Sequence, residues 1–93
     1  MTYNIIVEDE AKHDLLNIYN YISINDSFAK AKKFILELEK KILTLEKMPY
    51  RCRDSYYVKN EKCKDLIYKK YTIVFKITDK TLHILSIFRQ KSY

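Results

Sequence analysis

Basic and aromatic side chains lie close together just after the single proline, and this combination suits binding to a polyanion. Arg51 and Arg53 are followed within a few residues by Tyr56 and Tyr57. Guanidinium groups bind phosphates and bases stack on tyrosine rings, so these four residues are a candidate nucleic-acid surface. The same cations would equally receive acidic side chains of a protein partner. Tyrosine is also common in sheets for packing reasons alone.

Two histidines are candidates for acid–base chemistry. The imidazole of His83 has the right chemistry for proton transfer near neutral pH. Alternation along an apolar run places His83 on the face opposite Leu82 and Ile84. The same alternation places His83 and the apolar Ile87 on one face of the strand, so we expect a packed or half-exposed structural histidine. His13 is expected to face solvent on a helix.

The cysteines give no indication of a metal site. Cys52 and Cys63 lack Cys-x-x-Cys spacing, and neither histidine stands in ligand spacing with a cysteine. We therefore expect no zinc site, no other cofactor and reduced thiols. The sequence leaves open whether the two cysteines approach each other.

Charge is distributed unevenly along the chain. Residues 1–50 carry 7 Lys and Arg against 8 Asp and Glu, whereas residues 51–93 carry 11 against 4, so the C-terminal half accounts for the net +6. This asymmetry indicates an acidic or polyanionic partner for that half, although a lysine-rich solvated surface would look the same.

Size and hydropathy predict one globular domain over residues 1–93. A hydrophobic content of 47% is ordinary for a folded protein. No apolar run approaches the roughly 18 residues of a membrane span, so we expect no membrane association. Residues 1–10 lack the basic start of a signal peptide, and a cytoplasmic location is expected.

The elements that position these residues begin with a strand at residues 3–7 and two helices. Apolar positions between residues 11 and 22 recur every three or four residues, which predicts a helix that ends near Ser23. Capping residues at 25–27 and a regular apolar seam predict a second helix from Phe28 to the stop at Met48-Pro49. The short link between the helices predicts an antiparallel hairpin.

After Pro49 the apolar period becomes alternating. Residues 55–58 suggest a strand, and residues 66–68, 71–77 and 82–88 are stronger candidates. The turns lack glycine, so Asp79 is the residue best able to take an unusual turn conformation. The predicted fold class is α+β: a β-strand, an antiparallel helix hairpin, then an antiparallel β-meander.

The order and spacing of these core residues resemble the RelE/ParE superfamily of toxins, and the first helix resembles its ParE-like branch in particular. The resemblance covers nearly the whole chain. It rests on Ala11-x-x-Asp14-Leu15-x-x-Ile18-x-x-Tyr21-Ile22, on Ala29, Leu38, Ile42, Leu45 and Pro49, and on Lys64-Asp65-Leu66-Ile67, Tyr71-x-Ile73-Val74-Phe75 and Leu82-x-Ile84-Leu85-x-Ile87.

The resemblance implies a toxin neutralised by a cognate antitoxin, usually encoded beside it. RelE-like members cleave messenger RNA on the ribosome, whereas ParE-like members poison DNA gyrase and have no accepted catalytic set. RelE-like enzymes commonly carry arginine directly after the tyrosine matched here by Tyr71. Thr72 stands at that position and supplies no cation, which favours the ParE-like branch.

A ribosome-dependent nuclease remains the alternative. Metal-free RNA cleavage needs a base, cations and an acid, and the resemblance offers Lys64, Arg89, Lys91 and Tyr93 for these tasks. A solvated basic terminus explains the last three equally well, and ParE-like chains share it.

The favoured hypothesis is therefore a non-enzymatic toxin directed at DNA gyrase. The first alternative is an RNA-cleaving toxin, and the second is an inactive module that binds nucleic acid or antitoxin. In either toxin hypothesis we expect the antitoxin's binding segment to be acidic or amphipathic and to cover the sheet or the helix hairpin.

Overall fold

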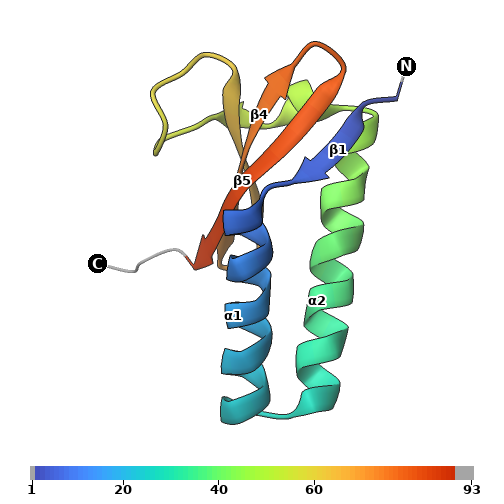
Figure 1. Cartoon of the computed structure of the whole chain (residues 1–93), viewed down its shortest axis with the longest axis vertical. Helices are drawn as coiled ribbons and strands as arrows, with labels where there is room; N and C mark the ends of the chain where they lie inside the picture. Colours follow the sequence, from blue (N-terminus) through green and yellow to red (C-terminus); the bar gives the residue numbers. More distant parts are fainter. Residues whose placement is uncertain (1, 90–93) are drawn as a thin grey trace.

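A computed structural model describes residues 2–89 as two layers, a helix hairpin packed on one face of a sheet (Figure 1). The α+β prediction is confirmed. The elements are β1 (Asn4–Val7), α1 (Asp9–Asn25), α2 (Phe28–Leu43), the 3-10 turns η1 (Thr44–Glu46) and η2 (Pro49–Arg51), β2 (Arg53–Asp54), β3 (Cys63–Tyr68), β4 (Tyr71–Thr78) and β5 (Thr81–Arg89). Neither helix in this part of the chain is long and apolar enough to cross a bilayer.

The turn of the hairpin forms where the capping residues predicted it. Helix α1 continues slightly past the expected end at Ser23, to Asn25, whose side-chain amide donates to the carbonyl of Tyr21 at 2.8 Å. The Ser27 hydroxyl accepts the amide of Lys30 at 3.1 Å and so caps α2. Two residues link the helices, which forces them to run antiparallel.

The second helix ends earlier than predicted. Helix α2 stops at Leu43, and η1 carries the chain on toward Pro49. The Thr44 hydroxyl donates to the carbonyl of Lys41 at 2.6 Å, and the tighter 3-10 turn still places Leu45 in the core. The apolar seam therefore continues past the end of the α-helix, which is why the sequence pattern looked like one longer helix.

The sheet has five strands in the order β1-β5-β4-β3-β2. Strands β3, β4 and β5 form the predicted antiparallel meander. Strand β1 lies parallel to β5, with Asn4 opposite Thr81 and Val7 opposite Ile84. The helix hairpin thus leads from β1 at one edge of the sheet to β2 at the other edge.

The prediction of a strand at residues 55–58 is wrong. The strand next to β3 is the two-residue β2, which ends at Asp54. The Ser55 hydroxyl accepts the amides of Tyr57 and Val58, each at 3.2 Å, and this local bonding bends the chain out of the sheet.

Both hairpin turns use a positive φ without glycine. Asp79 has φ 50°, which confirms the sequence prediction, and Lys69 has φ 54°. Each is the first of two turn residues, the position at which a type II′ turn usually carries glycine. A left-handed lysine costs about 1 kcal/mol, and the Lys69 ammonium is held by the Glu37 carboxylate at 3.2 Å.

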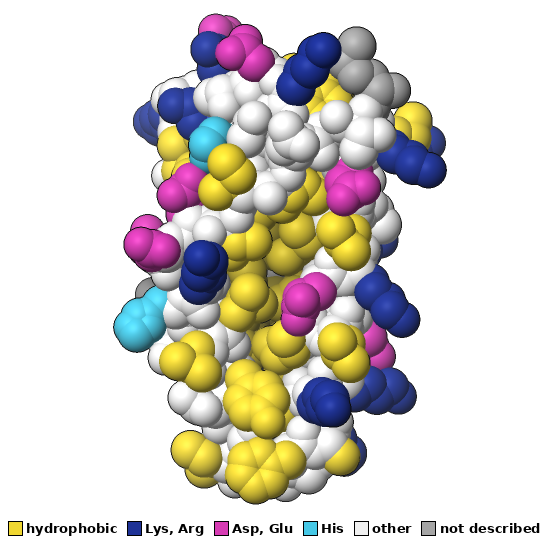
Figure 2. Space-filling model, turned by 45° about the vertical axis from the view of Figure 1, so that its right-hand side comes forward, with side chains coloured by type: hydrophobic (Ala, Val, Ile, Leu, Met, Phe, Trp, Pro, Cys, Tyr) yellow, Lys and Arg dark blue, Asp and Glu magenta, His cyan; other side chains and the backbone are white. Residues whose placement is uncertain are grey.

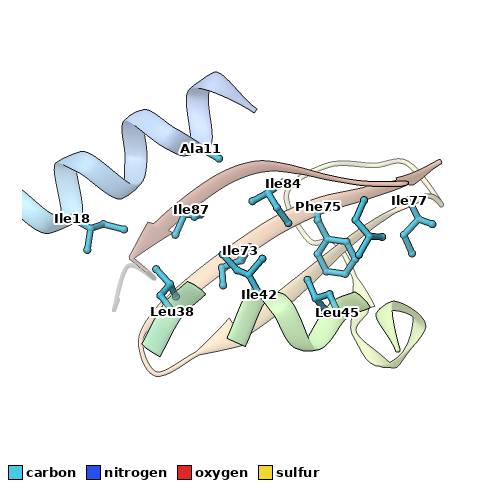
Figure 3. Close-up of a cluster of buried hydrophobic side chains, with 11 residues drawn as sticks. Ala11, Ile18, Leu38, Ile42, Leu45, Ile73, Phe75, Ile77, Ile84 and Ile87 are labelled. Atoms are coloured by element: carbon cyan, nitrogen blue, oxygen red, sulfur yellow. The ribbon is translucent and has the colours of Figure 1, made fainter. Parts of the chain in front are cut away.

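A β-bulge in β5 sets the composition of the core. Phe75 pairs with Ile84 and Val74 with Ser86, so Leu85 is an extra residue. The extra residue changes the alternation and brings Ile87 to the helix side, which corrects the expectation that it shares a face with His83. Figure 3 shows the resulting core between both helices and the sheet: Ala11, Ile18, Leu38, Ile42, Leu45, Ile73, Phe75, Ile77, Leu82, Ile84 and Ile87.

Candidate functional site

Asp65 organises the region where the basic and aromatic residues meet. Its side chain is 0% exposed, and one oxygen accepts from the Arg53 guanidinium at 3.4 Å and from the Tyr56 amide at 3.1 Å. The Arg53 guanidinium carbon lies 3.8 Å from the centre of the Tyr56 ring. One buried carboxylate thus brings Arg53 and Tyr56 together as a stacked pair at the surface.

The other two residues of the predicted patch make different contacts from this pair. Tyr57 packs edge-on against Phe88, with ring centres 4.7 Å apart. Phe88 pairs with Thr72, which is buried on the sheet face opposite the helices. Arg51 is exposed in η2. Of the four residues, only Arg53 and Tyr56 stack on each other.

Arg51 and Arg53 instead line a groove between the end of α2 and the short edge of the sheet. The groove has a volume of about 670 Å³. Its lining includes the cations of Lys41, Lys47, Arg51 and Arg53, and its one acidic residue is Asp65, which is paired with Arg53. We call this cavity the basic groove.

Lys64 is largely buried and ion-paired. Its side chain is 12% exposed, and its ammonium lies 3.0 Å from a carboxylate oxygen of Asp54. The same ammonium lies 5.8 Å from the centre of the Tyr50 ring. The contacts of Lys64 are those of a side chain that fastens β3 to β2.

Arg89 lies far from Lys64. Lys64 pairs with Phe75 and Arg89 with Tyr71, on opposite sides of β4. Four residues along β4 and two strand spacings separate their Cα atoms by roughly 16 Å. Arg89 lines a separate pocket of about 410 Å³ with Tyr21 and Tyr71. Lys91 and Tyr93, the other two candidates for RNA cleavage, lie outside the described residues.

Both nitrogens of His83 are occupied by side chains. Nδ1 lies 2.8 Å from Glu8 Oε1, and Nε2 lies 3.1 Å from Thr78 Oγ1. The ring is partly exposed, as predicted for a structural histidine, and it connects the loop after β1 to the β4–β5 hairpin. His13 is exposed on α1, also as predicted.

The cysteines are free and lie apart. Arg53 pairs with Asp65, so Cys52 lies level with Leu66, and its Cα atom is roughly 11 Å from that of Cys63, beyond the reach of a disulfide. Burial raises the pKa of both thiols, which disfavours thiolate chemistry. Within residues 2–89 no three His, Cys, Asp or Glu side chains gather as a metal site.

Sequence reasoning missed two acidic residues that fix this architecture. Asp65 stands in a strand beside Leu66 and Ile67, where a lone carboxylate indicates a buried partner. Asp14 stands on the apolar side of α1, and its carboxylate accepts the Ile87 amide at 2.9 Å. That bond satisfies an amide of β5 beyond the end of β1.

The helix hairpin also exposes apolar side chains on its outer side. Leu36 and Leu43 are two helical turns apart and so share a side of α2, and the exposed Phe28 lies within about 80° of them around the helix. Leu16 lies about 140° around α1 from the buried Ala11. Figure 2 shows apolar side chains gathered along the hairpin between charged flanks. We call Leu16, Phe28, Leu36 and Leu43 the apolar helix face.

Comparison with known proteins gives the fold and one family. A family described as "ParE toxin of type II toxin-antitoxin system, parDE" matches residues 5–92. No curated protein matches the sequence significantly.

Two solved structures share the fold over almost their full length. The chromosomal ParDE TA system from P. aeruginosa aligns with a TM-score of 0.83 at 17% identity, over 97% of this chain and 98% of that chain. The toxin–antitoxin complex RelBE2 from Mycobacterium tuberculosis aligns with a TM-score of 0.74 at 14% identity, over 99% of this chain and 95% of that chain. At these identities the similarity is one of fold.

Proposed function

Because the chain belongs to the ParE toxin family of type II toxin–antitoxin systems, we propose that it arrests growth by binding DNA gyrase and catalyses no reaction. We further propose that it acts in the cytoplasm and that a cognate antitoxin holds it inactive. The observation that carries the non-enzymatic proposal is the separation of Lys64 from Arg89.

A nuclease must gather its base and cations around one phosphate, within hydrogen-bond reach of the reacting atoms. Lys64 is instead bound to Asp54, and Arg89 lies at the other end of β4. The position after Tyr71, where RelE-like enzymes commonly carry arginine, holds the buried Thr72. These three features support a toxin that acts by binding.

One feature favours the alternative of ribosome-dependent RNA cleavage. The stacked pair of Arg53 and Tyr56 is at the surface, and its guanidinium and ring suit a phosphate and a base. Asp65 occupies part of that guanidinium, which weakens the case. The alternative therefore ranks second.

Induced expression with plasmid supercoiling and messenger RNA followed together tests the proposal. We expect early relaxation or double-strand breaks of the plasmid while messenger RNA stays intact. Purified chain should then inhibit supercoiling by purified gyrase. Early loss of messenger RNA with normal supercoiling would contradict the proposal and support the nuclease. An absence of growth arrest would support an inactive binding module.

We propose that the antitoxin covers the apolar helix face with an amphipathic helix. Four large apolar side chains on one side of a helix hairpin are costly to leave in water. A helix with apolar residues three and four positions apart would fill the line they form.

A further inference from the structure

One edge of β3 has no partner over part of its length. Strand β2 pairs with β3 only at Asp65 and Lys64. Tyr68 and Tyr71 close a two-residue hairpin, so Tyr68 and Leu66 direct their backbone groups toward β4. The amide and carbonyl of Ile67 therefore point to the opposite edge, where no strand lies among the described residues.

The basic groove lies along this free edge. Leu66 and Ile67 line it together with Lys41, Lys47 and Arg51. These three cations form none of the ion pairs found among the described residues. The groove thus combines an unpaired backbone edge, an apolar floor and uncompensated positive charge.

We propose that the free edge of β3 at Ile67 binds an extended acidic peptide segment of a partner protein as an additional strand. The segment's backbone would pair with the amide and carbonyl of Ile67. Its carboxylates would lie against Lys41, Lys47 and Arg51. The site shares no residue with the apolar helix face and does not depend on gyrase as the target.

A peptide fits this groove better than a nucleic acid does. A phosphate backbone matches the cations but has no alternating amides and carbonyls to pair with a strand edge. Strand addition uses both features of the groove, whereas phosphate binding uses only the charge.

Binding of short blocked peptides to the purified chain tests the proposal by fluorescence anisotropy. The probe alternates glutamate with valine and threonine. One matched control replaces glutamate with lysine, and another keeps the sequence but carries N-methyl groups on the amides that face the edge. We expect the probe to bind and both controls to fail. Equal binding of the N-methylated peptide would overturn strand addition, and binding of single-stranded RNA in place of the acidic peptide would overturn the choice of ligand.

Variants of the chain locate the site. Ile67→Pro removes an amide that the fold leaves unpaired, and proline is tolerated on an edge strand, so binding should disappear while the circular dichroism spectrum is retained. Lys47→Glu and Arg51→Glu should each weaken binding about fivefold, and Lys80→Glu in the β4–β5 turn should not. If Ile67→Pro misfolds, the two charge variants and the N-methylated peptide still decide the matter. Unchanged affinity in both charge variants would place the peptide elsewhere.

Discussion

Asp65 is the residue on which the loop after β2 depends, because its buried carboxylate holds both the Arg53 side chain and the Tyr56 backbone. Asp65→Ala leaves both donors without that acceptor. We expect the free energy of unfolding to fall by about 2–3 kcal/mol, measured by urea denaturation. The stacked Arg53–Tyr56 pair should separate as well, because Asp65 positions both of its members.

Asp54→Ala is the matched control for this variant. Asp54 also forms an ion pair, with Lys64, but its side chain is 82% exposed. The Asp54 carboxylate is solvated although Lys64 is largely buried, so we expect a loss of about 1 kcal/mol, smaller than for Asp65→Ala. Equal destabilisation by the two substitutions would show that the burial of Asp65 does not increase the contribution of its bonds to the free energy of unfolding.

Glu37 should make stability depend on pH through its bonds to β3 and the following turn. The Tyr68 hydroxyl, at 2.9 Å, and the Lys69 ammonium lower the pKa of Glu37. A lowered folded-state pKa gives stability above the unfolded value of about 4.3, and this stability is lost as pH falls through the folded value. The hydrogen bond to Glu37 raises the pKa of Tyr68. The stability that this bond contributes is therefore present below about pH 10 and is lost as pH rises through the folded-state pKa of Tyr68.

The measurement is the difference in unfolding free energy between the natural chain and Glu37→Gln across the pH range. We expect this difference to be constant between about pH 5 and 9 and to fall toward zero at lower and at higher pH. A difference independent of pH would show that the Glu37 charge contributes nothing.

The elements differ in how far local sequence determines them. The helix hairpin follows from apolar spacing and the Ser27 cap, and both signals lie within a few residues of the structure that they specify. The loop after β2 depends on Asp65, and the bulge at Leu85 depends on the register with β4. Such long-range pairing carries no local signal, so the face predicted for Ile87 was wrong. The strand predicted at residues 55–58 was wrong because Ser55 bends the chain locally and the distant Asp65 binds the resulting loop.

The candidate site could be predicted only in part for the same reason. Proximity in sequence suggested that Arg51, Arg53, Tyr56 and Tyr57 act together. Only Arg53 and Tyr56 stack on each other, because Asp65 from β3 binds both. Lys41 and Lys47 join the arginines in the basic groove because η1 folds back toward β3, which composition alone does not reveal.

The outer side of the helix hairpin gives a prediction for the antitoxin. Leu36→Glu and Leu43→Glu together should weaken binding of the cognate antitoxin by roughly 100-fold, because two leucines that the complex would bury are lost and two charges are introduced. Isothermal titration calorimetry measures the change. Both side chains are exposed in the free chain, so its fold should be unaffected.

Ile6→Glu is the control for that pair, because it places the same charge at another exposed apolar residue, on β1. It should leave antitoxin affinity unchanged. If the Leu36/Leu43 variant keeps its affinity, the antitoxin does not bind the helix hairpin and the sheet becomes the candidate surface.

At the scale of the whole molecule, apolar and charged contact regions are separate. The apolar helix face belongs to the N-terminal half, which is close to neutral. The basic groove lies where the two halves meet, with Lys41 and Lys47 from the N-terminal half and Arg51 and Arg53 from the C-terminal half. A partner that used both would need an amphipathic helix and an acidic extended segment, so a single acidic, amphipathic chain wrapped around the domain satisfies both surfaces.

The mode of action is also a property of the whole molecule, and Lys64→Met tests it. Methionine keeps the length and apolar stem of lysine but removes the ammonium. Asp54, left behind, is solvated, so the chain should remain folded. Because Lys64 is largely buried, a toxin that acts by binding gyrase should arrest growth as strongly with methionine there. A nuclease that used Lys64 as its base should lose roughly 100-fold or more in RNA cleavage and in toxicity. Growth arrest and messenger RNA decay after induction, at matched protein levels, distinguish the two results.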